Sequence, residues 1–414
     1  MNWDESKLGD VAKVISGYAF KSKDFSENKG VPVIKIKNIQ KEKVEISDDY
    51  FLDESFLSIN SKFHCVKDDV LISLTGSHIT LPNSVVGRVA KYQYDFTSLL
   101  NQRGGKIVVT DKNKLVNNYL YYYLCQHEVR TTLALFGRGG ANQVNISPSN
   151  VESIKIDLPP LQTQKRIASI LSAYDDLIEN NLKRIELLEK AAQNIYKEWF
   201  VNLRFPDYKN ISVNEETGLP EGWEEKEIGS IITFLGGYAF KSKTYIENGK
   251  YRVITIKNVG DKVFDTSVGN SVDSIPDKMK EHCKIIEGDI LLSLTGNVGR
   301  SCIAYGENNL LNQRVAKIVS TNKNWLPYIY WMFNDNKMFS LMNSLATGAA
   351  QQNLSPVKLA KEKFVIPCES IIKLYCLKAN SVFKQIVLLN KQNQKLKASR
   401  DILLPRLMNR TIEV

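Results

Sequence analysis

The stretch Gly17-Tyr18-Ala19-Phe20-Lys21-Ser22-Lys23 decides the fold, because it recurs unchanged at Gly237 to Lys243, 220 residues later. Ser73-Leu74-Thr75-Gly76 recurs at the same offset, as Ser293 to Gly296. A repeat of this length is far too long for one unit of a solenoid. In a chain of 414 residues it indicates two whole domains with the same fold, since domains usually contain about 100 to 200 residues.

The matches continue in the same order towards the end of each copy, although the offset falls. Eight extra residues in the first copy, 77–84, account for the first fall, from 220 to 212. The unbroken order excludes chance similarity. The later matches are Val86 to Arg88 with Val298 to Arg300, Leu100 to Arg103 with Leu311 to Arg314, and Gln143, Asn145 and Pro148 with Gln351, Asn353 and Pro356.

Short apolar runs bounded by Gly, Asn, Asp and Pro predict strands in each copy. In the first copy these runs are 31–36, 70–74, 106–109 and 154–158. The tyrosine-rich run 118–129 predicts a helix. Each copy is therefore expected to form a mixed α/β domain.

A long heptad pattern follows the proline that closes each copy, Pro160 in the first and Pro367 in the second. Apolar residues recur in steps of three and four through about 162–200 and about 370–404, as in helices that pack along one seam. We expect these two helices to pair antiparallel. The alternative is that each helix packs on its own domain, but a helix of this length would overhang it.

Polar residues interrupt the two seams and predict their register. Asn181 interrupts the first seam, and Asn393 and Arg400 interrupt the second. At the offset of 208, Asn393 is the equivalent of position 185, so a pseudo-twofold relation brings the two amides together near the middle of the pair. A buried amide pair costs stability but fixes the register, because slippage would leave each amide against leucine.

The composition is that of a globular protein with a basic surface. Hydrophobic residues make up 43% of the chain and charged residues 24%, and the net charge of +10 favours a polyanionic partner. The first residues lack an apolar run after a basic start, and no stretch approaches the roughly 18 apolar residues of a membrane span. The six cysteines show no disulfide pattern. We therefore expect a cytoplasmic protein.

The order of domain, long helix, domain and long helix resembles the specificity (S) subunits of type I restriction–modification systems over nearly the whole chain. Each matching segment is weak by itself, but together and in order they are specific. They are Pro160-Leu161 leading into a helix, Ile195 to Phe200, Arg204-Phe205-Pro206, Leu219 to Trp223, and Arg400 to Met408.

This resemblance implies an α+β fold of two target-recognition domains, 1–160 and 206–367, and two spacer helices, 161–205 and 368–414, in a pseudo-twofold arrangement. Each domain is expected to read one part of a bipartite, asymmetric site in double-stranded DNA. The helices are expected to form an antiparallel coiled coil that docks two methylation subunits, which methylate adenine, and restriction subunits join them. S-adenosylmethionine, ATP and Mg are then expected in those partners. The chain itself is expected to hold no catalytic residue, cofactor or metal.

The candidate DNA contacts are polar and basic residues in the repeated loops, because Arg suits guanine, Asn and Gln suit adenine, and Lys and hydroxyls suit phosphate. For the lysines and threonines, a solvated strand end or an ordinary turn is an equal alternative. In the first copy the candidates are Lys21, Lys23, Thr75, Ser77, Arg88, Gln102, Arg103, Arg138, Asn142 and Gln143. In the second copy they are Lys241, Lys243, Thr295, Asn297, Arg300, Gln313, Arg314, Thr347, Gln351 and Gln352.

The strongest single candidate is the flexible, amide-rich run 137–143, with its partner 346–352. At least one member of each Asn-Gln-Arg run is expected to be structural, because one face of a strand points inward. Residues shared by both copies cannot alone make the copies read different bases. Specificity is therefore expected where the copies diverge, as in 77–84, after Lys23 and Lys243, and at Arg138 against Thr347.

An enzyme in its own right is the main competing class. Asp157 to Leu161 faintly resembles the Asn/Asp-Pro-Pro-aromatic motif of amino-methyltransferases, but its carboxylate is one residue out of place. Asp207 with Glu224 and Glu225 offers carboxylates for a metal-dependent nuclease, but these residues belong to a polar linker. A stand-alone nuclease or methyltransferase is therefore disfavoured.

Two further alternatives are a zinc protein and a scaffold. His64-Cys65 and His282-Cys283 offer zinc ligands, but neighbours on a strand point to opposite faces and no Cys-x-x-Cys occurs. We expect these pairs to be structural. The basic charge and the duplicated loops argue against a scaffold that does not touch DNA.

Overall fold

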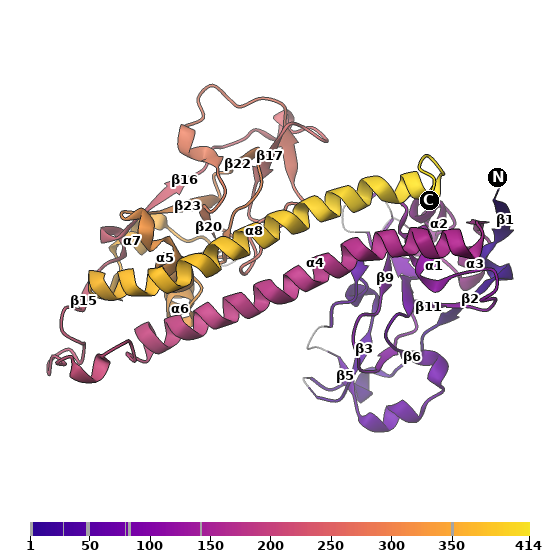
Figure 1. Ribbon diagram of the computed structural model, residues 1–414, viewed down its shortest axis with the longest axis horizontal. Coiled ribbons are helices and arrows are strands. Elements are labelled where there is room, and N and C mark those ends of the chain that lie inside the picture. The colour runs from indigo at the N-terminus through magenta and orange to yellow at the C-terminus, as the bar shows by residue number, and fades with distance from the viewer. Residues whose placement is uncertain are drawn as a thin grey trace. The chain divides into compact units, whose positions relative to one another are not determined.

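The computed structural model describes residues 3–27, 29–46, 50–78, 80–81, 84–140, 143–348 and 352–414. They form two compact units (Figure 1). The first unit contains residues 1–176 and 398–414, and the second contains 177–397. Each unit therefore combines one copy of the repeat with parts of both long helices.

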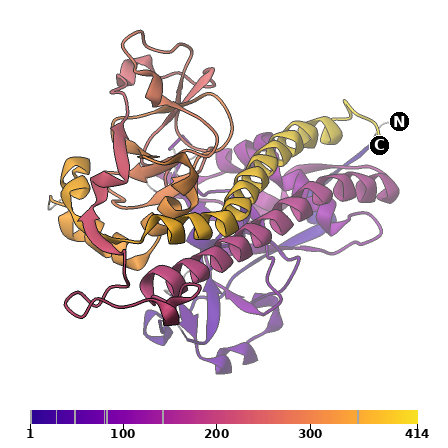
Figure 2. The same cartoon turned by 60° about the vertical axis from the view of Figure 1, so that its left-hand side comes forward.

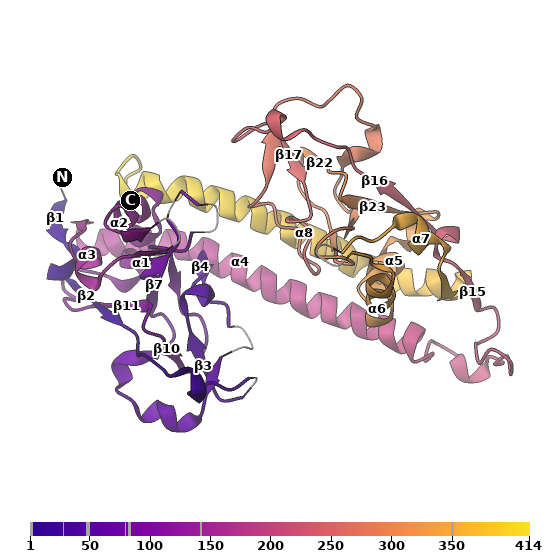
Figure 3. The same cartoon turned by 180° about the vertical axis from the view of Figure 1, so that it is seen from behind.

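The first unit is built on two larger sheets (Figure 3). One has the order β2 (Ala12–Ser16), β11 (Gly104–Val109), β7 (Val70–Ser73), β9 (Val89–Lys91) and β4 (Glu42–Lys43). The other has the order β5 (Phe51–Leu52), β3 (Val31–Ile34), β10 (Ser98–Leu100) and β6 (His64–Cys65). Smaller sheets join β12 (Arg138–Gly140), β13 (Gln143–Asn145) and β8 (Thr75–Gly76), and β1 (Asp4–Lys7) with β14 (Lys155–Leu158). The helices are α1 (Asn117–Cys125), α2 (His127–Leu135) and α3 (Pro148–Glu152).

The second unit repeats this topology. One sheet has the order β16 (Ile232–Gly236), β23 (Val315–Ser320), β20 (Ile290–Ser293) and β21 (Ser301–Ile303). The other has the order β18 (Asn270–Val272), β17 (Tyr251–Ile254), β22 (Asn309–Leu311) and β19 (Lys284–Ile285). β15 (Glu224–Glu227) pairs with β24 (Lys363–Ile366), and the helices are α5 (Leu326–Phe333), α6 (Asn336–Leu345) and α7 (Pro356–Lys361). The expected pair of mixed α/β domains is confirmed.

The tyrosine-rich segment departs from the prediction. A single helix was expected over 118–129, but α1 ends at Cys125 and α2 begins at His127. Between them Gln126 has extended backbone, with φ −63° and ψ 141°. Its backbone N–H and its side-chain amide both donate to the carbonyl of Tyr123, at 3.3 and 3.1 Å. These bonds satisfy the end of α1 without the glycine or proline that would mark a break in the sequence.

A buried lysine–aspartate pair supports the central strand in each unit. In the first unit Lys106 of β11 lies 3.3 Å from Asp69 and donates to the carbonyl of His64 at 2.7 Å. In the second unit Lys317 of β23 lies 2.6 Å from Asp289 and donates to the carbonyl of Lys284 at 3.0 Å. Because each ammonium has a carboxylate and a carbonyl, its burial is compensated.

Two long helices contribute a part of their length to each unit. They are α4 (Leu161–Tyr196), extended by a π turn over Lys197–Val201, and α8 (Glu369–Met408). In the second unit they run alongside each other (Figure 2), and the hydroxyl of Tyr375 donates to the carbonyl of Ala192 at 3.2 Å. In the first unit the start of α4 and the end of α8 share one core, which includes Leu171 and Leu407.

The predicted contact between Asn181 and Asn393 is present in the second unit. The amide nitrogen of Asn181 donates to the amide oxygen of Asn393 at 2.9 Å, and both residues are buried. Asn393 also donates to the carbonyl of Ile178 at 3.5 Å. The antiparallel register expected from the two seams is therefore confirmed at this point.

In each unit a tyrosine of the α/β domain also donates a hydrogen bond to a carboxylate of α4, and the two tyrosines are 208 residues apart. In the first unit the hydroxyl of Tyr122 donates to Asp175 of α4 at 2.6 Å, and Arg400 of α8 donates to the same carboxylate at 2.5 Å. In the second unit the hydroxyl of Tyr330 donates to Glu189 of α4 at 3.0 Å. The polar break at Arg400 is thus satisfied by a buried ion pair.

Candidate nucleic-acid interface

In the first unit, four segments far apart in sequence meet at one edge of the domain, which we call the loop edge: residues 17–20, 74–77, 101–104 and 143–146. The backbone N–H of Gln102 donates to the carbonyl of Tyr18 at 2.9 Å. The N–H of Leu74 donates to Arg103 at 3.0 Å, and the N–H of Ile146 donates to Leu74 at 2.9 Å. Backbone bonds therefore hold the repeated motifs together.

The second unit builds its loop edge from 237–240, 294–297, 312–315 and 352–354 in the same way. The N–H of Gln313 donates to Tyr238 at 3.0 Å. The N–H of Leu294 donates to Arg314 at 3.0 Å, and the N–H of Leu354 donates to Leu294 at 2.8 Å. The motifs that recur in the sequence thus recur as one structural frame.

The glycine that opens the repeated heptapeptide is required by this frame. A Cβ atom at Gly17 would lie 2.3 Å from the carbonyl oxygen of Asn101, and one at Gly237 would lie 2.3 Å from that of Asn312. Both distances are far inside van der Waals contact, so no larger residue fits without moving the backbone. The glycines allow the first and third segments of the loop edge to touch.

Two of the three candidate threonines, Thr75 and Thr295, are buried beneath the loop edge. Thr75 is 6% exposed and Thr295 is 7% exposed. The hydroxyl of Thr75 donates to the side-chain oxygen of Asn145 at 2.8 Å, and that of Thr295 donates to Asn353 at 2.8 Å. Both hydroxyls are therefore used inside the domain rather than exposed to a ligand.

The candidate arginines Arg88 and Arg300 are half-buried and have partners within their own units. Arg88 donates to the side-chain oxygen of Gln40 at 2.8 Å and to the carbonyl of Ser84 at 3.1 Å. Removal from water lowers the pKa of its guanidinium below the ordinary value. Arg300 lies 3.2 Å from Asp261 and stacks over the ring of Phe339. Contact of either arginine with DNA stays a prediction.

The remaining candidates differ in how far they reach solvent. Ser77 is half-buried, and its carbonyl accepts from the hydroxyl of Ser84 at 2.7 Å. Asn142 and Gln351 lie outside the described residues, and so does the side chain of Arg138. The backbone of Arg138, in β12, pairs with that of Asn145 in β13. The exposed candidates are Lys21, Lys23, Gln102, Arg103, Gln143, Lys241, Lys243, Asn297, Gln313, Arg314, Thr347 and Gln352. Their contact with DNA stays a prediction.

The Asn-Gln-Arg runs have the expected division between inward and outward members. Asn312 is 8% exposed, and its side-chain oxygen accepts from the N–H of Arg314 at 3.4 Å. Gln313 and Arg314 are exposed, as are Gln102 and Arg103 in the first unit. The first residue of the second run therefore shapes the turn, while the next two extend from it.

The sequence motifs missed three residues at this edge. Asn145 and Asn353 were used to align the copies, but their bonds to the threonines could not be inferred, because the partners are 70 and 58 residues away. Tyr18 lies in the repeated heptapeptide and is 43% exposed beside Gln102. Their recurrence in both copies was the available signal.

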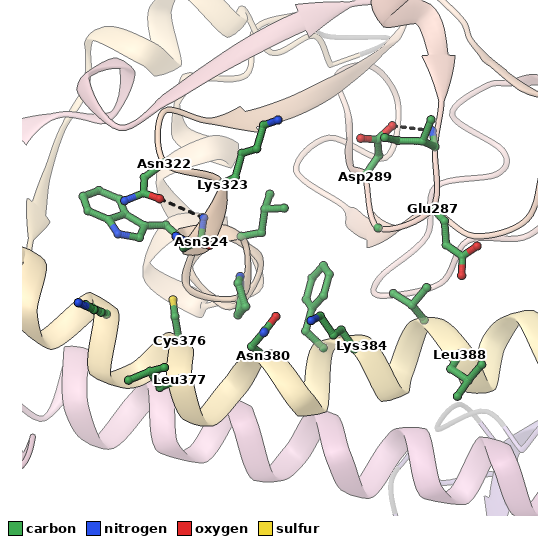
Figure 4. A pocket seen from close by; sticks show the side chains of 18 of the residues that line it. Glu287, Asp289, Asn322, Lys323, Asn324, Cys376, Leu377, Asn380, Lys384 and Leu388 are labelled. Atoms are coloured by element: carbon green, nitrogen blue, oxygen red, sulfur yellow. Dashed lines mark hydrogen bonds between the residues drawn. The ribbon is translucent and has the colours of Figure 1, made fainter.

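One groove lies away from the loop edge and contains none of the candidate residues. It is a groove of about 1000 Å³ in the second unit, between α8 and the loops 286–289 and 322–327 (Figure 4). Its wall on α8 includes Leu377, Asn380 and Leu388. Acidic and basic side chains line the groove, and they belong to segments outside the repeated motifs.

Four of the six cysteines are buried, and these include the cysteine of each His-Cys pair. Burial raises the pKa of the thiols of Cys65 and Cys302, which disfavours the thiolate that a metal would bind. Among the described residues, no group of three or more His, Cys, Asp or Glu side chains is arranged to hold a metal ion. In the same residues, no helix is long and apolar enough to cross a membrane.

Comparison with known proteins places the chain in a family. The family model described as the type I restriction modification DNA specificity domain matches residues 1–190 and again 220–398. The MjaIX type I restriction enzyme specificity subunit of Methanocaldococcus jannaschii is 26% identical over 420 residues, covering 98% of this chain and 93% of that relative. A second protein of that organism, named for the MjaX type I restriction enzyme, is 29% identical over 251 residues, covering 60% of this chain and 57% of the relative.

A solved structure has the same fold. The crystal structure of the type I restriction–modification system S subunit from M. genitalium is similar with a TM-score of 0.57 and 17% identity, covering 99% of this chain and 96% of that one. The two family matches coincide with the two copies of the repeat, including the start of the helix that follows each copy. The chain therefore belongs to the family of type I restriction–modification DNA specificity proteins, with one copy of the family's domain in each half.

Proposed function

We propose that this chain reads a bipartite, asymmetric site in double-stranded DNA, with each loop edge contacting one part. The observation that carries this proposal is the duplicated frame with divergent exposed side chains. Both edges use the same backbone bonds and the same threonine–asparagine pair. The two copies differ in sequence beside these edges, as at Thr347, which stands where the first copy has Arg138. Two similar modules with different contact residues suit two different half-sites.

The chain acts in this proposal as the DNA-reading subunit of a cytoplasmic type I complex. Two methylation subunits dock on it and supply S-adenosylmethionine, and restriction subunits that use ATP and Mg join them for cleavage. Its membership of the specificity family supports this assignment. The exposed Arg103 and Arg314 of the loop edges, and the exposed lysines that end each heptapeptide, suit the phosphates of the duplex on a chain of net charge +10.

Sequencing of methylated adenines tests the proposal directly. DNA exposed to the chain together with its methylation partner should carry methyl groups within one motif made of two short blocks around an unread gap of fixed length. Methylation at a single uninterrupted motif would contradict two reading domains. Methylation without sequence preference would contradict the whole assignment.

The purified chain by itself should neither transfer methyl groups nor cleave DNA. The sequence has no glycine-rich cofactor loop after a strand, and the comparisons place the chain among specificity proteins. The assay is methyl transfer and plasmid nicking by a preparation shown by mass spectrometry to lack partner subunits. If methyl transfer or cleavage co-purifies with the chain in a preparation free of partner subunits, the chain would be an enzyme in its own right.

A further inference from the structure

One tyrosine recurs at both loop edges, in the same position of the repeated heptapeptide, as Tyr18 and Tyr238. The backbone N–H of Tyr18 donates to the carbonyl of Leu100 at 2.8 Å, and that of Tyr238 donates to the carbonyl of Leu311 at 2.8 Å. Each tyrosine carbonyl accepts in turn from the N–H of the glutamine in the neighbouring Asn-Gln-Arg run. Both main-chain groups of the tyrosine are therefore fixed in the frame.

Aromatic neighbours hold the ring of each tyrosine. The ring centroid of Tyr18 lies 5.0 Å from that of Phe20 and 5.4 Å from that of Phe63. The ring centroid of Tyr238 lies 5.1 Å from that of Phe240. A phenylalanine would make the same ring contacts, so packing does not explain the hydroxyl that both copies carry.

The two hydroxyls have no hydrogen-bond partner within the described part of the chain. Tyr18 is 43% exposed. Tyr238 is half-buried, but its hydroxyl is not enclosed without a partner, as the hydroxyl of Tyr328 is. Each phenol therefore offers a hydrogen-bond donor to solvent at the loop edge, next to the exposed glutamine that its carbonyl holds.

The presence of the same residue in both copies determines the kind of acceptor that it suits. The two units are proposed to read different bases, so a group that both carry in one position suits what every half-site presents. On a duplex this is the sugar–phosphate backbone, and tyrosine hydroxyls are among the groups that contact phosphate oxygens. The exposed Lys21 and Lys23, and Lys241 and Lys243 in the second copy, follow the tyrosine and favour the same acceptor.

We propose that Tyr18 and Tyr238 each donate the phenolic hydrogen to a backbone phosphate of the half-site that their unit contacts. The inference rests on the proposed function. Because both copies carry the tyrosine, its contribution is the same for every base sequence. The contact fixes the position of each loop edge on the duplex, while the divergent residues read the bases.

The substitutions Tyr18→Phe and Tyr238→Phe remove the hydroxyls and keep the rings. DNA binding is measured on the full chain assembled with its methylation subunits. Each substitution should weaken binding about tenfold, the size expected for one hydrogen bond to a charged group. The loss should be equal for the cognate duplex and for duplexes altered at the bases of either half-site. The salt dependence of binding should not change, because no charged side chain is removed.

Two controls separate contact with DNA from a role in folding. Tyr208→Phe makes the same chemical change outside the four segments of the loop edge, at a tyrosine that is 39% exposed, and should leave binding unchanged. The urea midpoint should be the same for Tyr18→Phe, Tyr238→Phe and the unaltered chain, because neither hydroxyl has a partner among the described residues. A lowered midpoint together with weaker binding would assign the hydroxyls a structural role and overturn the inference.

Methylphosphonate substitution identifies the phosphate. Neutralising one phosphate of the first half-site should weaken binding by the unaltered chain more than binding by Tyr18→Phe, and Tyr238→Phe should show the same effect with a phosphate of the other half-site. Equal losses in altered and unaltered chains at every phosphate, or a loss confined to one base sequence, would overturn the inference alone. A complex of the unaltered chain without a bipartite preference would overturn the proposed function itself.

Discussion

Val144 and Gln352 occupy equivalent positions in the two copies, but one is buried and the other is exposed. Val144 is buried and fills the space beside Gly137, where an added Cβ would lie 2.1 Å from its methyl group. Gln352 is exposed, and its carbonyl accepts from the N–H of Gly296 at 3.0 Å. The same backbone position is therefore part of the core in one unit and part of the surface in the other. Such single exchanges can change what an edge contacts while leaving its frame intact.

Substitutions in the runs 137–143 and 346–352 should separate the two half-sites. Arg138→Ala and Gln143→Ala should weaken or relax recognition of one half-site, and Gln351→Ala and Gln352→Ala should affect the other. A lost bidentate contact to a base costs about 1–3 kcal/mol. The measurement is methylation of a library of DNA duplexes in which each position of the motif is varied to every base. It gives the base preference at each position of both half-sites. Equal relaxation of both half-sites by either set would contradict one domain for each half-site.

At the scale of elements, the buried amide pair between α4 and α8 is the clearest specification of register. Asn181→Leu leaves the amide of Asn393 without its side-chain partner, which should destabilise the chain by about 1–3 kcal/mol. The double change, Asn181→Leu with Asn393→Leu, should cost less than the sum of the two single changes, because neither amide is then left behind. Urea unfolding of the four chains measures this. Strict additivity would mean that the two amides do not stabilise each other.

The contact between Glu189 of α4 and Tyr330 predicts a dependence on pH. Removal from water raises the pKa of the Glu189 carboxyl above its ordinary value of 4.5, while the bond from Tyr330 and the charge of Lys262 oppose this. A carboxyl with a raised pKa in the folded state contributes stability below pH 4.5 that is lost as the pH rises through the folded value. Glu189→Gln keeps an acceptor for the tyrosine hydroxyl and should remove that loss.

The measurement is the urea midpoint from pH 4.5 to pH 8. The unaltered chain should lose stability over this range relative to Glu189→Gln, and the variant should be the more stable at pH 7. Glu186→Gln, an exposed neighbour on the same helix, is the control and should leave the profile unchanged. A less stable Glu189→Gln chain at pH 7 would show that the ionised carboxylate is favourable in this position.

Features that follow from regular spacing along the sequence were predictable, whereas contacts between distant segments were not. The pairing of Asn181 with Asn393 was predictable, because heptad period and repeat offset fix both positions independently. The buried pairs of Lys106 with Asp69 and of Lys317 with Asp289 were not, since the lysines stand within apolar strand runs and each aspartate comes from the turn before a neighbouring strand. The bond between Thr75 and Asn145 was also hidden, because it depends on which strands become neighbours. The exposed lysines of the heptapeptide were identified, but solvent exposure is not evidence of contact with DNA.

At the scale of the whole molecule, the helices are expected to set the spacing between the two reading domains. α4 has 36 residues, so it is about 54 Å long at about 1.5 Å per residue. That length corresponds to between one and two turns of DNA, at about 34–36 Å per turn. The unread gap in the motif is therefore expected to depend on helix length and not on the loop edges.

Insertions at the boundary between the units test this. Four residues added between 176 and 177, and four between 397 and 398, leave the Asp175–Arg400 and Asn181–Asn393 contacts within their own units. The added turn of about 6 Å should lengthen the gap by about two base pairs and leave the half-site bases unchanged. Seven residues, which preserve the heptad phase, should lengthen it by about three. Methylated-adenine sequencing gives the gap, and an unchanged gap would contradict a helical ruler.

The assignment of residues 398–414 to the first unit has a consequence for biosynthesis. Leu407 and Met408 are part of the core that also contains Leu8 and Tyr119, and the guanidinium of Arg410 stacks over Trp3. A ribosome delivers these residues after the entire second unit. The first domain therefore cannot complete its core until the last helix has been synthesised. Synthesis proceeds at about 5–20 residues per second. We expect translation that stops early to leave the core of this domain incomplete, because Leu407 and Met408 would be missing from it.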